Sequence, residues 1–306
     1  MTATGRPDAE SRPVQRYLQQ QKAGQTSLRI LLGVQLRRLR RESGFSLEQA
    51  AKCFDGTVNA ARTKIQRLEH GDTGCQEDVL AKLLDHYGVT DAEERDDYLE
   101  LASRAAVQPW WYEYNEVVEK WFRRHIDLER EAHTIRTYEV HFIPGLLQTE
   151  AYARAVTEFG YPHLPARKIE RLVELRMVRQ EILTHEDAPR LWCVVDEGTL
   201  RREWGGQAVL REQLEHLLRI VELPRVSIQV APGRSPVTGN HPISLLQFTE
   251  PDLPDLVYLE QFSNAVYHHK QNHLDQYTMI MDRLSAEALD PEETPAFLEK
   301  LLAQLP

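Results

Sequence analysis

The stretch that decides the fold reads LGVQLRRLRRESGFSLEQAAKCF over residues 32–54 and continues as TKIQRLEHGD over residues 63–72. Ser46 can cap a short helix, because the small and apolar residues after it recur at i, i+3, i+4 and i+7 and share one side. They are Leu47, Ala50, Ala51 and Phe54. Turn residues 55–57 follow, and a second periodic set (Ala61, Ile65, Leu68) ends before Gly71, where a C-cap is expected. The stretch predicts a helix–turn–helix.

The second helix of this pair has a polar surface opposite its apolar residues. Its side chains are of the types that hydrogen-bond base edges and phosphates. They are Asn59, Thr63, Gln66 and Arg67, with Arg62 and Lys64 on the flanks. We expect Arg62, Thr63 and Gln66 to select bases. Arg41 and Lys52 are expected to bind phosphates, and Ser46 is the remaining candidate for a DNA contact. A small helical bundle with a solvated basic surface is the alternative interpretation.

Charge is distributed unevenly along the chain. Residues 1–74 carry a net charge of +6 and residues 75–306 carry −16, within a total of −10. This asymmetry predicts a phosphate-binding head on an acidic body that does not touch DNA. Residues 1–26 are predicted to be a flexible arm. Its basic residues are Arg6, Arg12, Arg16 and Lys22. They could reach a DNA groove, although a solvated tail is the simpler role.

The two quoted runs resemble the Xre type of DNA-binding domain, which is related to the Cro and lambda-repressor modules. The resemblance implies that the recognition helix begins around Arg62 and enters the major groove of double-stranded operator DNA. This chain has about four residues more than the compact pattern between Phe54 and Ile65. If the helix instead began near Asn59, then Asn59 and Thr63 would reach the bases and Arg62 would turn toward a phosphate.

Helical periodicity continues to about residue 102 and predicts a mainly α, five-helix domain over residues 27–106. The sequence QPWWYEY from Gln108 then predicts a hinge packed between two domains. Residues 107–306 combine helical segments with short strand-like runs beginning at Leu191, Val226, Ile243 and Leu256. They predict an α+β domain with a small sheet of about four strands.

Several runs in this second domain resemble the antitoxin-like body domain of WhiJ-type regulators from filamentous bacteria. Among them are IRTYEVHFIPGLLQTEAYARAV from Ile135 and REQLEHLLRIVELPRVSIQVAP from Arg211. The resemblance implies a transcription regulator that binds a small protein encoded nearby, in a toxin–antitoxin-like arrangement. We expect this domain to form a homodimer as well. Two alternatives are a ligand sensor whose segment Pro144 to Gln148 lines a small-molecule pocket, and an enzyme with an attached DNA-binding head.

Few residues indicate a disulfide framework, a metal site or a catalytic site. The three cysteines (Cys53, Cys75, Cys193) are odd in number and far apart, so we expect reduced, buried thiols without a disulfide framework or metal site. His268, His269 and His273 could hold a metal, but a solvated loop is the preferred interpretation. We expect no catalytic site and no cofactor. The sequence has no apolar run of membrane-spanning length and no leader, which predicts a cytoplasmic protein without membrane contact.

Overall fold

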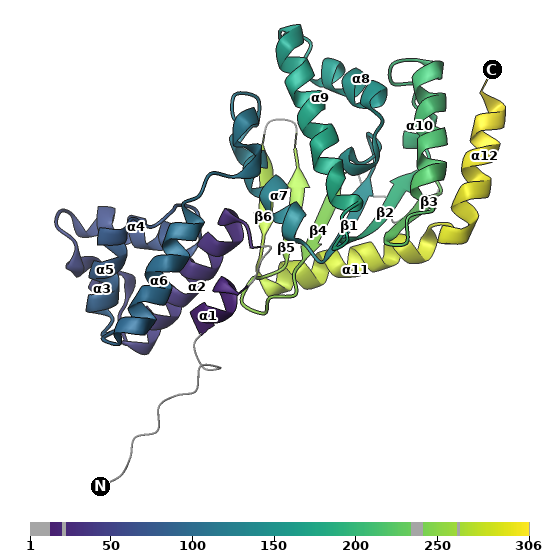
Figure 1. Cartoon of the computed structure of the whole chain (residues 1–306). Coiled ribbons are helices and arrows are strands. Elements are labelled where there is room, and N and C mark those ends of the chain that lie inside the picture. Colours follow the sequence, from purple (N-terminus) through teal and green to yellow (C-terminus); the bar gives the residue numbers. More distant parts are fainter. Residues whose placement is uncertain (1–12, 20–22, 234–240, 262–263, 306) are drawn as a thin grey trace. The chain divides into compact units, whose positions relative to one another are not determined.

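The structure, a computed structural model, describes residues 13–19, 23–233, 241–261 and 264–305. The chain divides between Trp110 and Trp111 into two compact units (Figure 1). The described N-terminal unit is helical, as predicted. Its elements are α1 (Pro13–Leu18), α2 (Gln25–Glu42), α3 (Leu47–Ala50), the short 3-10 helix η2 (Ala51–Cys53), α4 (Val58–Glu69), α5 (Glu77–His86) and α6 (Ala92–Ala105).

Helix α1 differs from the predicted flexible arm. Val14 and Tyr17 are buried in the N-terminal unit, and the Tyr17 hydroxyl accepts a hydrogen bond from Gln35 Nε2 of α2 at 2.7 Å. At the end of the helix, Arg104 Nη1 of α6 donates to the Leu18 carbonyl at 2.7 Å. Residues 13–18 are therefore part of the helical core. Arg6, Arg12 and Lys22 lie outside the described residues.

Two glycines allow α2 to approach the end of α4 closely. A Cβ atom on Gly33 would lie 2.4 Å from the Leu68 carbonyl oxygen, so no larger residue fits there without moving a helix. Gly71 ends α4 in the left-handed conformation (φ +70°), and a Cβ atom on it would lie 2.8 Å from the backbone of Ile30. The predicted helix end is confirmed, with His70 as the C-cap and Gly71 directly after it in the left-handed conformation, and close packing adds a second reason for glycine there.

A buried ion pair fixes the same junction. Arg40 of α2 donates to both carboxylate oxygens of Glu69 in α4, at 2.5 and 2.8 Å, and also to the Phe45 carbonyl at 2.8 Å. Arg37 adds a hydrogen bond to the Glu69 carbonyl at 2.8 Å. Both arginines lie in the basic head that the sequence predicted to bind phosphates. Their guanidinium groups instead hold the recognition helix in place.

The C-terminal unit is α+β, as predicted, and carries a mixed sheet with the strand order β3-β2-β1-β4-β5-β6 among the described residues. Its strands are β1 (Thr134–Glu139), β2 (Arg190–Asp196), β3 (Val226–Ala231), β4 (Ile243–Gln247), β5 (Leu256–Glu260) and β6 (Ala265–His268). Its helices are α7 (Lys120–Glu131), α8 (Glu150–Gly160), α9 (Ala166–Gln180), α10 (Gln207–Ile220), α11 (Gln271–Glu287) and α12 (Thr294–Gln304). Short 3-10 helices are η3 (Trp110–Tyr114), η4 (Gly145–Leu147), η5 (Glu181–Leu183), η6 (Thr199–Arg201) and η7 (Pro291–Glu293).

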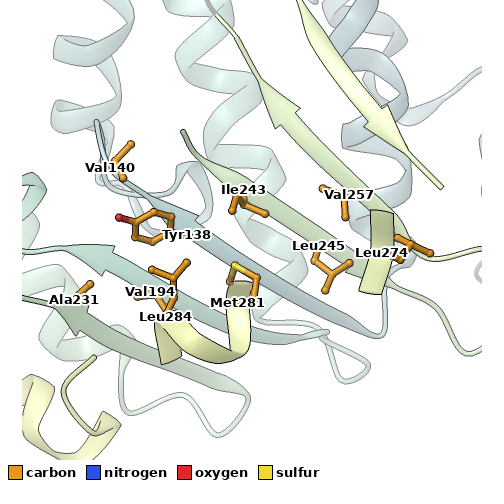
Figure 2. Packing of buried hydrophobic residues seen from close by; sticks show 10 residues of the cluster. All are labelled: Tyr138, Val140, Val194, Ala231, Ile243, Leu245, Val257, Leu274, Met281 and Leu284. Atoms are coloured by element: carbon orange, nitrogen blue, oxygen red, sulfur yellow. The ribbon is translucent and has the colours of Figure 1, made fainter. Parts of the chain in front are cut away.

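The four predicted strands are present, and β1 and β6 are additional. Strand β1 is central: it pairs in parallel with β2, Ile135 opposite Leu191, and antiparallel with β4, Ile135 opposite Leu246. One face of the sheet packs on α11 through a cluster of apolar side chains (Figure 2). The cluster comprises Tyr138, Val140, Val194, Ala231, Ile243, Leu245, Val257, Leu274, Met281 and Leu284.

The opposite face of the sheet is covered by α7 and α9, and its packing includes buried charges (Figure 1). Glu129 of α7 binds Arg179 of α9 through two hydrogen bonds of 2.9 and 3.0 Å, and it lies 3.3 Å from His125 Nε2. The His125 ring stacks on Tyr258 of β5 with ring centroids 4.1 Å apart. Burial opposes ionisation, but Arg179 and His125 lower the pKa of Glu129 to about 2. This ion pair joins α7 to α9.

The segment Pro144 to Gln148 is a buried connector rather than the wall of a pocket. Gln213 Nε2 donates to the Leu147 carbonyl at 2.7 Å, and Gln180 Nε2 donates to the carbonyls of Gly145 and Gln148. These bonds hold η4 against α9 and α10. The segment is therefore part of the core, which removes the reason for placing a ligand pocket along it.

The aromatic run after Gln108 and two of the cysteines differ from what the sequence predicted. In the aromatic run after Gln108, Trp111 and Tyr114 are buried within the C-terminal unit, and Trp111 Nε1 donates to Asp127 Oδ1 at 2.7 Å. Cys53 and Cys75 are only partly buried, and Cys193 is fully buried. Within the described part of the chain, no helix has both the length and the apolar character that crossing a membrane needs.

Candidate nucleic-acid interface

The recognition helix α4 begins earlier than the resemblance implied. Gly56 has a positive φ of +104°, which turns the chain after η2, and Thr57 then caps the helix by accepting a hydrogen bond from the Ala60 amide at 3.4 Å. Helix α4 starts at Val58. Of the two starts that the sequence left open, the structure has the earlier one, near Asn59. The predicted cap at Ser46 is also confirmed, because Ser46 and Gln49 form a reciprocal capping box.

The side chains of α4 divide cleanly between core and solvent. Ala61, Ile65, Leu68 and Glu69 are buried against the rest of the N-terminal unit. At 3.6 residues per turn, Asn59, Thr63 and Arg67 lie opposite this buried side. The predicted polar residues of the helix are all exposed: Asn59, Arg62, Thr63, Lys64, Gln66 and Arg67. Part of this face borders a shallow groove, whose walls include Asn59, Thr63, Lys64, Arg67 and Gln76.

The early start of α4 rotates Arg62 away from the centre of the exposed face. Its Nη1 lies 3.1 Å from Glu48 Oε1 of α3, in an exposed ion pair. Arg62 therefore lies on the flank of α4 that faces α3, and its role in reading bases stays a prediction. Lys64 lies on the other flank with its ammonium group 5.2 Å from the centre of the Phe54 ring.

The remaining candidates lie on the helices that brace α4. Arg41 at the end of α2 and Lys52 in η2 are both exposed, so both can meet a phosphate. Ser46 is exposed too, but its hydroxyl accepts from the Gln49 amide at 3.2 Å. Arg38 pairs with Glu42 of its own helix at 2.8 Å. Arg41 and Lys52, which the sequence assigned to phosphates, are thus both accessible.

The charge asymmetry lies partly inside the N-terminal unit. Residues 75–110, which contain α5 and α6, hold three basic residues and nine acidic ones. They cancel the net +6 of residues 1–74, so the sequence to Trp110 has no net charge, and residues 111–306 carry −10. The acidic surface that we assigned wholly to the body therefore begins within the head.

The histidine-rich segment does not converge on a metal site in the described structure. His268 of β6 meets His273 of α11, with 2.9 Å between the two Nδ1 atoms, and the Tyr277 ring stacks on His268. The structure thus pairs two of the three histidines that the sequence singled out. No group of three or more metal-ligating side chains forms among the described residues.

Comparison with known families agrees with the geometry of the head. Residues 31–97 match the family described as a helix-turn-helix domain, and with the exposed polar face of α4 this match supports a DNA-binding regulator. Residues 122–300 match the family described as a domain of unknown function, DUF5753. That match covers more than half of the chain, and the chain belongs to this family. No curated protein and no solved structure matches the chain.

Proposed function

We propose that the chain is a sequence-specific transcription regulator whose helix α4 enters the major groove of an operator. The observation that carries this proposal is the exposed polar face of α4, which a capped N-terminus and a buried ion pair hold on the helical core. Amide side chains such as Asn59 and Gln66 can bond the edge of adenine, and hydroxyls such as Thr63 bond several bases. Arg41, Lys52 and Arg67 supply phosphate contacts by displacing counterions.

Substitutions on α4 should change the preference between DNA sequences, whereas substitutions on its bracing helices should change the affinity for all DNA. Asn59→Ala or Gln66→Ala removes a base contact, so we expect the preference for operator over scrambled DNA to fall by about 1–3 kcal/mol. Lys52→Ala removes a phosphate contact. It should weaken both DNAs equally and lower the slope of log K against log salt by roughly one. Affinities for both DNAs at two salt concentrations measure these effects.

Arg62→Ala is the diagnostic variant, because its ion pair with Glu48 places it on the flank of α4. It should change the salt dependence and leave the base preference intact. Glu100→Ala, which removes an exposed ion pair with Arg104 on α6, serves as the control and should change neither. If Arg62→Ala loses the preference for operator over scrambled DNA while Asn59→Ala keeps it, the recognition helix is rotated relative to this assignment.

The C-terminal unit is proposed to form the dimer and to bind a small partner protein, as the family resemblance implies. An aromatic cluster with one exposed ring, Phe159, and two partly buried rings, Phe142 and Trp204, supports a protein-binding role. Phe159 at the end of α8 is 63% exposed, and its ring centre lies 4.6 Å from that of Trp204, which in turn lies 5.1 Å from Phe142. Clustered aromatic side chains are typical of the centres of protein interfaces. Two helix-turn-helix heads in a dimer would reach successive major grooves.

Phe159→Ser should reduce capture of the partner by the full-length chain while leaving DNA affinity unchanged. Truncating an aromatic residue at an interface centre costs about 2 kcal/mol or more, which corresponds to roughly 30-fold weaker binding. The measurement is co-purification with the proteins encoded beside the gene, followed by titration. Met279→Ser is the matched control, since Met279 is 53% exposed on α11. Equal loss in both variants, or none in Phe159→Ser, would remove this surface as the partner site.

A further inference from the structure

A groove runs between helices α8 and α10 on the surface of the C-terminal unit. It has a volume of about 480 Å³ and is lined by residues of α8, of α10 and of the turn before α10. A buried hydrogen bond joins its two walls, because the amide of Thr149, the N-cap of α8, donates to Gln213 Oε1 of α10 at 2.7 Å. The groove is therefore formed without a partner, which lowers the entropic cost of binding one.

The floor of the groove is made of small and apolar residues. Ala151 and Ala155 lie one turn apart on α8, and Val209 of α10 completes the floor. Gly205 lies against both helices: a Cβ atom on it would be 2.9 Å from Ala155 Cβ and 3.1 Å from Val209 Cγ2. No large side chain rises from this floor, so a second helix can pack closely against it.

Phe159 extends the apolar floor at the end of α8. It follows Ala155 by four residues, so Ala151, Ala155 and Phe159 share one side of the helix. Its exposed ring packs against Trp204, the residue directly before Gly205. A row of side chains four residues apart is the ridge through which helices pack on one another. This side of α8 is therefore shaped to receive a helix.

The walls of the groove carry an excess of acidic side chains. Arg154, a basic residue of the lining, already binds Glu150 at 3.1 Å and the Glu170 carboxylate of α9 through two hydrogen bonds. Glu158 of α8 and Glu212 of α10 are both exposed, and neither has a hydrogen-bond or ionic partner among the described residues. One carboxylate on each wall is thus left to meet a cation.

We infer that this groove binds a basic amphipathic helix of the partner protein. The inference rests on the proposed protein-binding role of the C-terminal unit and adds the chemistry of the partner. The apolar side of that helix packs on the floor and on Phe159, while its Lys or Arg residues pair with Glu158 and Glu212. From Glu150 to Phe159 the axis of α8 rises by about 14 Å, so roughly three turns of the partner span the groove.

The charge of the groove disfavours other occupants. A second copy of the chain that met this face through its own groove would place carboxylates against carboxylates, which costs free energy. DNA phosphates and helices with acidic flanks would meet the same repulsion. The dimer contact proposed for the C-terminal unit is therefore expected away from this groove.

The test uses the full chain and two fluorescently labelled peptides of about 15 residues, which is close to four helical turns. In the basic peptide Leu recurs at i, i+4 and i+8 and Lys occupies the flanking positions. In the acidic peptide Glu replaces each Lys. Fluorescence anisotropy should show that the basic peptide binds at micromolar concentration and loses affinity as salt rises. The acidic peptide should bind at least about ten-fold more weakly.

Matched charge reversals locate the binding. Glu158→Lys and Glu212→Lys, one on each wall, should each weaken binding of the basic peptide about ten-fold, because attraction becomes repulsion. Glu186→Lys is the control, since it makes the same change in charge at an exposed residue. Glu186 precedes β2, whereas Gly205 follows the other end of that strand, so the control should bind the peptide like the wild type. All three variants should keep the wild-type Tm.

These outcomes are separate from those for the natural partner. The groove assignment is wrong if the basic peptide does not bind the wild type or if the acidic peptide binds equally well. It is also wrong if the two wall variants bind the basic peptide as Glu186→Lys does. If the basic peptide binds as expected but no protein encoded beside the gene is captured, the groove assignment stands and the proposed partner is wrong.

Discussion

Glu69→Ala is expected to destabilise the N-terminal unit by about 3–5 kcal/mol, because it leaves the Arg40 guanidinium buried without its carboxylate. Arg40 and Glu69 are 9% and 4% exposed, and their two hydrogen bonds join α2 to the last residue of α4. Hydrogen exchange of α2 and α4 amides in the full chain measures the loss. DNA binding should fall with it, since α4 is no longer held.

Two further variants show whether the stability lost in Glu69→Ala comes from the burial of the ion pair. Glu42→Ala removes an exposed ion pair from the same helix and should change stability by less than about 0.5 kcal/mol. Arg40→Met combined with Glu69→Leu removes both charges and should recover much of the loss, because well-packed apolar residues often replace a buried ion pair without cost. If Glu69→Ala and the double variant lose the same stability, the shape of the side chains, rather than their charge, determines the loss.

Arg179→Met is expected to cost the C-terminal unit a similar amount, about 3–5 kcal/mol at pH 7, because among the described residues Glu129 then keeps only His125 as an ionic partner. The effect should depend on pH. In the wild type the pKa of Glu129 is lowered to about 2, so its contribution is complete above the unfolded pKa of roughly 4.3 and is lost as pH falls toward 2. In the variant that pKa rises, and the stability deficit should shrink in acid.

Urea unfolding followed by tryptophan fluorescence measures this effect, because all tryptophans but Trp110 belong to the C-terminal unit. Arg201→Met is the comparison, since Arg201 and Glu197 form an exposed pair. It should change stability by less than about 1 kcal/mol at every pH. A deficit in Arg179→Met that stays constant from pH 7 to pH 4 would mean that lost packing, rather than the buried charge of Glu129 without Arg179, causes it.

The sequence predicted the elements whose apolar residues repeat regularly and missed those whose polar residues interrupt the pattern. Helices α7 to α11 follow clear helical spacing, and four strands have continuous apolar runs. Strand β1 was missed although it is central, because Arg136 and Glu139 break the apolar run expected of a strand covered on both faces.

For the DNA-binding face, the sequence predicted which helix is exposed but not how it is rotated. The start of α4 depends on Gly56 and on Thr57 acting as a cap, and Thr57 can equally be read as a turn residue. The basic run of α2 was misjudged for a different reason. Arg40 is distinguished from Arg41 only by Glu69, a partner far along the chain that no local pattern reveals.

The cancelling charges of the N-terminal unit have a consequence for how it approaches a duplex. With +6 on residues 1–74 and an equal negative charge on residues 75–110, the unit behaves at long range as an electric dipole rather than a cation. A dipole is attracted weakly but is turned strongly by the field of the phosphates, so encounters should be pre-oriented. Part of the negative charge lies close to the exposed face of α4, because α5 begins at Glu77 next to the groove that α4 borders.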